Sequence, residues 1–507
     1  MTATSHASPT VSVVLPVYNS MPYLTGAIES VLAQDLTDIE VIAIDDGSTD
    51  GSGEALDRFA AQDSRLSVIH QPNSGWPGMP RNRGLEHAGG RFVFFMDSDD
   101  TMPPHALRAM VEMADDPRSK RPADIVIPRF EGVGGRRVQS LFARYPQGTI
   151  GLERALESLS PQKLFRRELL EREHLRFPEG KVRLEDGIFV TQAYLAAERI
   201  AFCGKRPLYA IVDRDDGQNI SAQDIEPAGY VASCRRIAGL LLESIPDRGR
   251  AELLIAQFFW RKGLKFYALE RWAEIPAEIR VEWIELHRAF LRDLVPVELD
   301  AKAATPTDRR KLALLRAGDA DGLEALIAAA PRLTHVSECT GTRRVDGGIE
   351  ISVAVTPDGE DSLLREVDLP SRSRLRAADH VNRALRPLFG TRAGRGASRR
   401  LAAALTGEAP EAHLVLSGRR VGRAVSVPGR LVGAEPGSGE LRFRFVLPDS
   451  LLQRYRGDRV DLWTVAAVDP ELSGGRVRVR ARKSFSKQLQ KTRVYSTDQG
   501  NVSLAIQ

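Results

Sequence analysis

Residues 92–100 read FVFFMDSDD, an apolar run that ends directly in three carboxylates. The run predicts a buried strand, because short apolar segments bounded by polar residues are typical of strands covered on both faces. Alternate side chains of an extended chain point the same way, so we expect Asp97 and Asp99 to share one side of the strand end. Carboxylate oxygens there suit Mg²⁺ or Mn²⁺. Alternatively, the acids cap a following helix that begins near Pro103 and Pro104.

Strands and helices alternate on both sides of this stretch. Such alternation predicts a mostly parallel, doubly wound α/β sheet, in which ligands gather at the carboxyl ends of the strands. The predicted strands are residues 11–17, 39–44, 66–69, 92–96 and 124–127, and the predicted helices begin at 23 or span 52–61, 81–87 and 104–113.

Two other strands of this sheet also end in polar or aromatic groups. The first strand ends in PVYN at residues 16–19, and the second runs into DDGSTD at residues 45–50. Tyr18 can stack on a base, and Asp46 can accept a hydrogen bond from a base imide or a ribose hydroxyl. Alone, the second motif also fits a turn followed by a helix cap.

A loop rich in glycine and proline, QPNSGWPGMPRNRG, occupies residues 71–84. It enters a helix whose first turn holds Arg81 and Arg83. Arginine at a helix start can face a phosphate, because the first turn of a helix itself attracts anions. The alternative is a solvated surface charge, the commoner place for an arginine.

These four motifs stand in the order and spacing of glycosyltransferase family 2, which the chain resembles over about residues 10–225. The resemblance implies a GT-A fold, a nucleotide-diphosphate sugar as donor, usually a UDP-sugar, and a divalent cation, Mn²⁺ or Mg²⁺. It assigns donor binding to Pro16, Tyr18, Asp46, Asn73, Arg81, Asp97 and Ser98, and metal binding to Asp99 with Asp97.

A late acidic pair, Glu185-Asp186, resembles the family's catalytic-base motif. Inverting transfer needs a carboxylate that removes the proton of the acceptor hydroxyl, and the resemblance gives that role to Asp186, with Glu185 beside it. Adjacent carboxylates also tend to raise the pKa of one of them. A helix-starting acidic pair is the structural alternative. The resemblance also implies an arginine and a serine on a loop that closes over the donor diphosphate, here Arg214 and Ser221, and it places Arg129 near that diphosphate or near the acceptor.

The chain is expected to divide into three domains. Residues 1–230 form the nucleotide-sugar-binding domain, and the pattern of residues 231–330 is helical, as in Ala251–Leu269 and Val281–Leu294. Residues 331–507 alternate short apolar runs with turns, which predicts an all-β sandwich used as an accessory or oligomerisation domain. This layout resembles wall teichoic acid glycosyltransferases, which implies N-acetylglucosamine transfer to a glycan or polyol-phosphate polymer and a homo-oligomer, with a trimer as one option.

Charge is unevenly spread along the chain. Residues 331–507 carry 30 basic against 19 acidic side chains, whereas residues 1–330 carry 41 against 48. Residues 372–430 contain thirteen basic and three acidic side chains, and four arginines alternate with small apolar residues at 476–482. Such a stripe suits a polyphosphate polymer or an anionic membrane, and otherwise is a solvated strand face. Nucleic acid is not expected, because no aromatic residues interleave with the arginines.

Composition favours the cytoplasm. No apolar run approaches the roughly 20 residues of a membrane span, and residues 1–10 lack a signal pattern. The three cysteines are far apart and odd in number, so they predict neither a disulfide framework nor a metal cluster. We therefore expect a cytoplasmic enzyme, at the inner face of the membrane if its basic region meets lipid.

Other functions fit the sequence less well. A nucleotidyltransferase needs a glycine-rich, basic phosphate loop after the first strand, and residues 16–20 contain neither glycine nor a basic residue. A Rossmann dehydrogenase is disfavoured because that turn lacks G-x-G-x-x-G. The remaining alternative is a carbohydrate- or polymer-binding scaffold built on an inactive transferase domain, against which Asp97, Asp99 and Asp186 argue.

Overall fold

The structure of the 507-residue chain is a computed structural model. It describes residues 8–134, 138, 147–212, 225–303, 305–359, 362–365, 411–419, 424–435, 438–467 and 473–507. The chain forms two compact units, of which the first comprises residues 1–259 and 293–295 and the second residues 260–292 and 296–507. The division falls within a helix of the segment expected to be helical.

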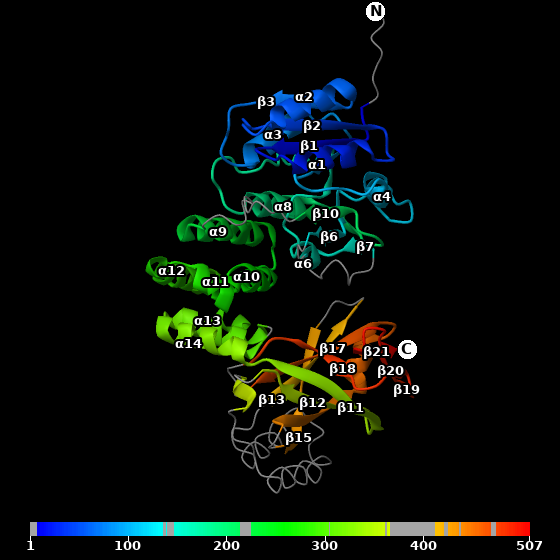
Figure 1. Ribbon diagram of the computed structural model, residues 1–507, viewed down its shortest axis with the longest axis vertical. Helices are drawn as coiled ribbons and strands as arrows, with labels where there is room; N and C mark the ends of the chain where they lie inside the picture. Colours follow the sequence, from blue (N-terminus) through cyan, green and yellow to red (C-terminus); the bar gives the residue numbers. More distant parts are fainter. Residues whose placement is uncertain are drawn as a thin grey trace, which may run out of the picture. The chain divides into compact units, whose positions relative to one another are not determined.

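Within the described residues, the first unit is built on a mixed sheet of eight strands (Figure 1). Strands β1 to β4 run parallel to one another, as predicted, and β8 lies antiparallel between β4 and β5. Strands β1, β2 and β4 are almost fully buried, which explains their continuous apolar character. The order is β3 (Leu66–His70), β2 (Ile39–Asp45), β1 (Val11–Val17), β4 (Phe92–Phe95), β8 (Leu164–Arg166), β5 (Ile125–Pro128), β9 (Ile200–Cys203) and β7 (Gly148–Ile150).

Helices pack on this sheet and bring loop residues to its carboxyl edge. Helix α3 lies against β1 and β2, where Gly84 permits close contact because a Cβ there would lie 2.4 Å from Val14. A separate parallel pair joins β6 (Phe130–Val133) to β10 (Tyr209–Val212). The helices are α1 (Tyr23–Leu32), α2 (Ser52–Gln62), α3 (Gly78–His87), α4 (Ala106–Ala114), α6 (Leu152–Ala155), α7 (Arg167–Arg172), α8 (Glu185–Ala196) and α9 (Pro227–Ser244).

The helical segment departs from the sequence prediction at one point. A single helix over Ala251–Leu269 was expected, but α10 (Arg248–Lys262) ends before Gly263, and a 3₁₀ turn follows at Leu264–Tyr267. Glycine weakens a helix interior, and the 3₁₀ turn buries Phe266 against Trp283, whose rings stack with centroids 4.1 Å apart. The further helices are α11 (Leu269–Glu274), α12 (Ala277–Leu294), α13 (Pro306–Ala317) and α14 (Ala320–Ala329).

In the described part of the C-terminal residues, eleven strands form one sheet. Strand β18 links its two halves, because it pairs parallel with β11 and antiparallel with β17. A short helix, α17 (Asp449–Leu452), follows β16. The path is β15 (Arg430–Glu435), β16 (Glu440–Pro448), β12 (Gly348–Pro357), β11 (His335–Val345), β18 (Val477–Ala481), β17 (Arg459–Ala467), β21 (Val502–Ile506), β20 (Thr492–Ser496) and β19 (Ser486–Leu489), with β13 (Glu411–Gly418) pairing β17 and β14 (Ala424–Pro428).

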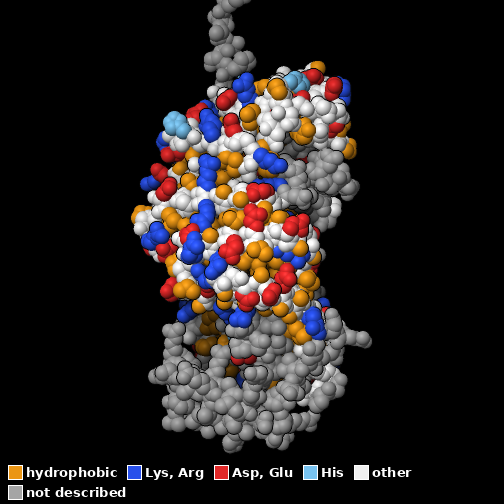
Figure 2. Space-filling model, turned by 90° about the vertical axis from the view of Figure 1, so that its left-hand side faces the viewer, with side chains coloured by type: hydrophobic (Ala, Val, Ile, Leu, Met, Phe, Trp, Pro, Cys, Tyr) orange, Lys and Arg blue, Asp and Glu red, His pale blue; other side chains and the backbone are white. Residues whose placement is uncertain are grey.

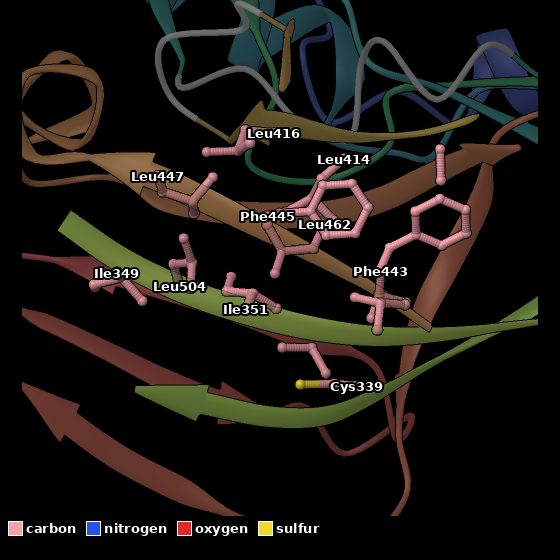
Figure 3. Close-up of a cluster of buried hydrophobic side chains, with 14 of the residues drawn as sticks. Cys339, Ile349, Ile351, Leu414, Leu416, Phe443, Phe445, Leu447, Leu462 and Leu504 are labelled. Atoms are coloured by element: carbon pink, nitrogen blue, oxygen red, sulfur yellow. The ribbon is translucent and has the colours of Figure 1, made fainter. Parts of the chain in front are cut away.

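Both halves of this sheet share one hydrophobic core, which confirms the predicted all-β domain. Ile351 of β12, Phe445 of β16 and Leu416 of β13 are fully buried in the same cluster as Leu462 of β17 and Leu504 of β21 (Figure 3). Alternation along these strands places every second side chain in the core. Cys339 lies at the edge of this cluster and, like Cys203 and Cys234, is buried and forms no disulfide with another described residue.

The described surface carries mixed charge. Basic and acidic side chains are interspersed on the face shown in Figure 2. In the predicted arginine stripe of residues 476–482, Arg478 is largely buried and paired with Asp461 at 2.7 Å, whereas Arg476, Arg480 and Arg482 are exposed, and Arg482 pairs with Glu338 at 3.3 Å. Residues 366–410, where most of the other predicted basic positions fall, lie outside the described residues. None of the described helices has the length and apolar character needed to cross a membrane.

Candidate functional site

The end of β1 places two predicted nucleoside-binding residues at the carboxyl edge of the sheet. Pro16 pairs in register with Ile44 of β2 and is partly buried. Tyr18 follows and exposes 51% of its surface, an uncommon position for a large aromatic ring. Asn19 turns the chain with a φ of 46° and accepts a hydrogen bond from the amide of Thr49, which ties the two strand ends together.

Asp46 is buried and organises the loop that leads into α3. Its carboxylate accepts hydrogen bonds from Gln71 Nε2 at 2.6 Å, from Ser74 Oγ at 2.8 Å and from the amide of Ser74. Gly47 next to it has a φ of 74°, and a Cβ there would lie 2.8 Å from the amide nitrogen of Asn73. The turn after β2 and the exposed Asn73 are thus held against each other, and contact of Asp46 with a nucleoside stays a prediction.

Asp97 lies at the end of β4 between two donors. Its Oδ1 accepts a hydrogen bond from Arg81 at 3.0 Å, and its Oδ2 accepts one from Gln162 at 2.6 Å. Ser98, which follows, lies 2.6 Å from Ser20 across their hydroxyl oxygens. Asp97 remains 36% exposed in its side chain, so it is fixed by the protein and still accessible.

The acidic strand end carries excess negative charge. Burial, together with the Asp97 and Asp99 carboxylates, raises the pKa of Asp100 to about 8. Among the described residues, no three His, Cys, Asp or Glu side chains converge where they alone could hold a metal ion. A divalent cation fits this donor set if one or two carboxylates bind it and phosphate oxygens and water complete its shell, as is usual for Mg²⁺.

Arg81 joins the strand end to the late acidic pair. Its guanidinium contacts Asp97 at 3.0 Å and Glu185 at 3.2 Å and lies over the Phe177 ring at 5.3 Å. The side chain is only 7% exposed, and its Nε lacks a partner in the protein. The arginine predicted to face a phosphate is therefore engaged by two carboxylates 16 and 104 positions away in sequence.

The two late acids occupy the first turn of α8 and have different surroundings. Glu185 is buried, and its burial and the neighbouring Asp186 raise its pKa to about 7, although Arg81 opposes the shift. Asp186 is partly exposed, and its Oδ1 accepts a hydrogen bond from the amide of Gly187 at 2.6 Å. Glu185 is thus fixed by an internal ion pair, whereas Asp186 is the acid that an acceptor can reach.

The remaining predicted residues differ in what the structure says of them. Arg129 lies between β5 and β6, partly buried, while Arg214 and Ser221 lie outside the described residues. Sequence reasoning missed Gln162, which holds Asp97, and Lys163, whose Nζ donates to Ser158 Oγ at 3.1 Å. Burial lowers the pKa of Lys163 to about 7, and Asp186 opposes that shift. Lys163 stands between Gln162 and the two apolar residues Leu164 and Phe165, so no local pattern marks it as buried.

With this geometry established, the comparisons with known proteins decide the family. Residues 12–182 match the family described as glycosyl transferase family 2. The chain contains a family 2 glycosyltransferase domain. Residues 227–327 match a second family, described as the glycosyl transferase TarS linker domain. The two matches cover the acidic strand end, Arg81 and the first helices after residue 226, while Asp186 follows the first match directly.

Two curated relatives of this chain are named for the same polymer, poly(ribitol-phosphate). The poly(ribitol-phosphate) beta-N-acetylglucosaminyltransferase TarS of Staphylococcus aureus is 31% identical over 57% of this chain and 50% of its own length. A poly(ribitol-phosphate) beta-glucosyltransferase of Bacillus spizizenii is 29% identical over 62% of this chain and 49% of its own length. The chain spans about half the length of the curated relatives it matches.

Solved structures of S. aureus TarS resemble this chain. TarS 1–349 in complex with UDP-GlcNAc matches with a TM-score of 0.56 at 29% identity, over 68% of this chain and 96% of that one. A further TarS crystal structure matches over 98% of this chain and 85% of that one, with a TM-score of 0.58 at 22% identity. The second match extends the shared fold to the C-terminal β domain.

Proposed function

We propose that the protein is an inverting, divalent-metal glycosyltransferase. In this proposal it moves a sugar, N-acetylglucosamine first among the candidates, from a UDP-sugar to a hydroxyl of a teichoic-acid-like polyol-phosphate polymer. The family 2 match and the relatives named for poly(ribitol-phosphate) support the class and the acceptor. The complex of TarS 1–349 with UDP-GlcNAc supports the donor. The two relatives name different sugars, so UDP-glucose and UDP-galactose remain candidates as well.

The Arg81 bridge is the observation that carries this proposal. A single guanidinium touches Asp97 at the end of β4 and Glu185 at the start of α8. The strand end that would meet the donor and the helix turn that carries Asp186 therefore lie within one side chain's reach. A transfer reaction needs this juxtaposition, because the acceptor oxygen must attack the carbon that the diphosphate leaves.

Asp99, with Asp97, would hold the divalent cation. The family resemblance gives the cation first to Asp99, while both oxygens of Asp97 accept hydrogen bonds, from Arg81 and Gln162. A bound Mn²⁺ or Mg²⁺ would supply charge stabilisation to the departing diphosphate. Burial, and after it the Asp97 and Asp99 carboxylates, raise the pKa of Asp100, and a cation at this edge would offset the repulsion among the three carboxylates.

Asp186 performs the proton transfer in the proposed reaction. Its carboxylate takes the proton of the acceptor hydroxyl while that oxygen attacks the anomeric carbon, and the bond from that carbon to the diphosphate oxygen breaks. Attack from the face opposite the leaving group inverts the anomeric centre. We assign nucleoside binding to Tyr18, Asp46 and Asn73 and diphosphate binding to Arg129. The same diphosphate role for Arg214 and Ser221, which are outside the described residues, stays a prediction.

Location and assembly follow from the same proposal. We place the enzyme in the cytoplasm, at the inner face of the membrane where a nascent polymer would be reached. A homo-oligomer, with a trimer as one option, and the role of residues 231–330 as a linker domain and 331–507 as an oligomerisation domain stay predictions. The competing function is a polymer-binding scaffold on an inactive domain, and an accessible Asp186 favours the enzyme.

Turnover of the nucleotide-sugar tests the proposal. A panel of UDP-sugars with Mn²⁺ is first ranked by thermal shift, because ligand binding to the native state raises its stability. Donor hydrolysis and transfer to a poly(ribitol-phosphate) acceptor are then measured for wild type, Asp186→Asn and the surface control Glu86→Gln. We expect Asp186→Asn to lose at least about 100-fold in kcat and to bind UDP normally, and EDTA to abolish turnover. No metal-dependent turnover in any of the three proteins would indicate the scaffold, and equal turnover in all three would show that Asp186 is not the base.

A further inference from the structure

Asn82 forms an internal clamp that the proposed mechanism does not use. It lies in α3 next to Arg81 and is 4% exposed. Its Oδ1 accepts a hydrogen bond from the amide of Phe177 at 2.8 Å, and its Nδ2 donates to the carbonyl of the same residue at 2.9 Å. One side-chain amide thereby pairs both main-chain groups of a buried residue, and Nδ2 also donates to Glu179 Oε1 at 3.0 Å.

A glycine one helical turn earlier serves the same contact. A Cβ on Gly78 would lie 2.2 Å from the carbonyl oxygen of Pro178, a separation that real Cβ atoms do not show. Positions 78 and 82 are four apart on α3 and therefore share one face of the helix. Two independent features of α3 thus bring the main chain of residues 177–179 against this face.

The clamped segment leads directly to the start of α8. The Phe177 ring stacks on Phe189 of α8 with centroids 3.9 Å apart and planes 13° from parallel. Phe189 lies three residues after Asp186 and so on the same side of the helix. Leu184 lies between Phe177 and α8 in the sequence, directly before the helix. It has a φ of 56°, a conformation that leucine rarely adopts and that surrounding contacts must enforce.

We propose that Asn82 is a positioning residue for Asp186. It fixes residues 177–179, and these fix the first turn of α8 through the Phe177–Phe189 stack and the short connection to Leu184. The inference rests on the proposed function, since it assigns Asn82 to the aim of the base in that reaction. The hydrogen bonds of Asn82 among the described residues run to Phe177 and Glu179 and not to Tyr18 or Asp46, so we expect its loss to affect proton transfer and to leave nucleoside binding intact.

The first test replaces Asn82 with leucine, which has similar size and no hydrogen-bonding atoms. We expect Asn82→Leu to lower kcat about 10- to 100-fold, because a displacement of about 1 Å at a reacting group has effects of this size. The KM for the UDP-sugar should stay within about threefold. Gly78→Ala should give the same pattern, and Glu86→Gln, an exposed change on the same helix, should leave both constants unchanged.

A second pair of variants separates positioning from a purely structural role. Asn82→Asp keeps an acceptor for the Phe177 amide but sets a carboxylate against Glu179. Adding Glu179→Gln supplies an amide donor that reverses the direction of the original hydrogen bond. We expect kcat, corrected for the folded fraction, to fall in Asn82→Asp and to recover in part in the double variant, while KM for the donor stays constant.

The outcomes distinguish this inference from the function beneath it. If wild type turns over a UDP-sugar and Asn82→Leu and Gly78→Ala both keep the wild-type kcat, Asn82 does not position the base and the proposed function stands. The same conclusion follows if kcat falls only as far as the folded fraction. If wild type turns over no nucleotide-sugar, both proposals fail. Should Asn82→Leu not fold, Gly78→Ala and the double variant decide between these results.

Discussion

At the scale of single residues, Arg81 illustrates how a buried charge depends on its partners. The guanidinium is 7% exposed and the Glu185 side chain 10%, so neither is well solvated. Removing one member of such a pair leaves the other charge buried without compensation, and this is more damaging than removing both. Arg81 therefore has a structural role in addition to whatever contact it makes with the donor.

We predict that Arg81→Met lowers the free energy of unfolding by about 3–5 kcal/mol. Asp97 and Glu185 then lose their common positive partner. The double variant Arg81→Met/Glu185→Gln should regain part of that loss, because it removes one of the uncompensated carboxylates. Urea unfolding of the single and double variants measures both values. Strictly additive losses would show that the two side chains do not stabilise each other.

The candidate site could be predicted from sequence as a set of residues but not as a set of contacts. Asp97 and Asp186 were identified because each follows a recognisable pattern at a strand end or a helix start. The ion pairs of Arg81 with Asp97 and Glu185 could not be predicted, because the three positions are far apart in sequence and no local rule links them. Gln162 was overlooked for the same reason, as its only signal is a contact made after folding.

At the scale of elements, the turn after β2 shows how backbone geometry fixes the edge of the sheet where nucleoside binding is proposed. Gly47 has a φ of 74° and lies so close to Asn73 that a Cβ would approach its amide nitrogen to 2.8 Å. Gly51, four residues later, has a φ of 90° and open space around the position of a Cβ. Glycine avoids the strain of a left-handed conformation at both positions. Only at Gly47 does the missing Cβ also allow Asn73 to pack closely against the turn.

This difference gives a matched pair of variants. Gly51→Ala should lower the free energy of unfolding by about 1–2 kcal/mol, the cost of a left-handed residue with a side chain, and leave UDP affinity unchanged. Gly47→Ala adds a steric conflict with Asn73 and should also weaken UDP binding about tenfold, equivalent to ~1.4 kcal/mol. Calorimetric titration with UDP checks both variants. Equal affinities would mean that this turn does not shape the nucleoside site.

The elements themselves were predictable where pattern and burial agree. The first strands and helices match their predicted ranges closely, because β-branched apolar runs and helical periodicity leave little ambiguity there. Strand β8 was not foreseen, since three residues, Leu164–Arg166, give no periodicity and their antiparallel insertion between β4 and β5 depends on distant partners. The break after α10 was missed because Gly263 is a weak local signal.

At the scale of the whole molecule, the two compact units differ in their buried ionisable groups. The second unit contains His287 and His335, and burial lowers the pKa of His287 to about 3 and that of His335 to about 4. His287 Nδ1 lies 2.8 Å from the hydroxyl of Tyr267, and His335 Nε2 lies 3.1 Å from that of Thr464. Both rings are therefore held neutral inside the folded second unit.

Acid should destabilise the second unit through these two rings. An unfolded histidine takes up a proton below about pH 6.5, whereas each folded ring resists protonation down to its lowered pKa, so the stabilisation is complete above pH 6.5 and is lost as pH falls below it. At pH 5.5 each ring accounts for a loss of about 1.4 kcal/mol in the free energy of unfolding.

We predict that His287→Gln reduces the fall in the free energy of unfolding between pH 7.5 and pH 5.5 by that amount. Tryptophan fluorescence during urea unfolding at pH 7.5 and 5.5 measures this change. It reports mainly on the second unit, which holds Trp260, Trp272, Trp283 and Trp463, whereas the first unit holds Trp76. If the free energy of unfolding of the variant fell between these pH values by as much as that of wild type, His287 would be protonated in the folded protein at pH 5.5.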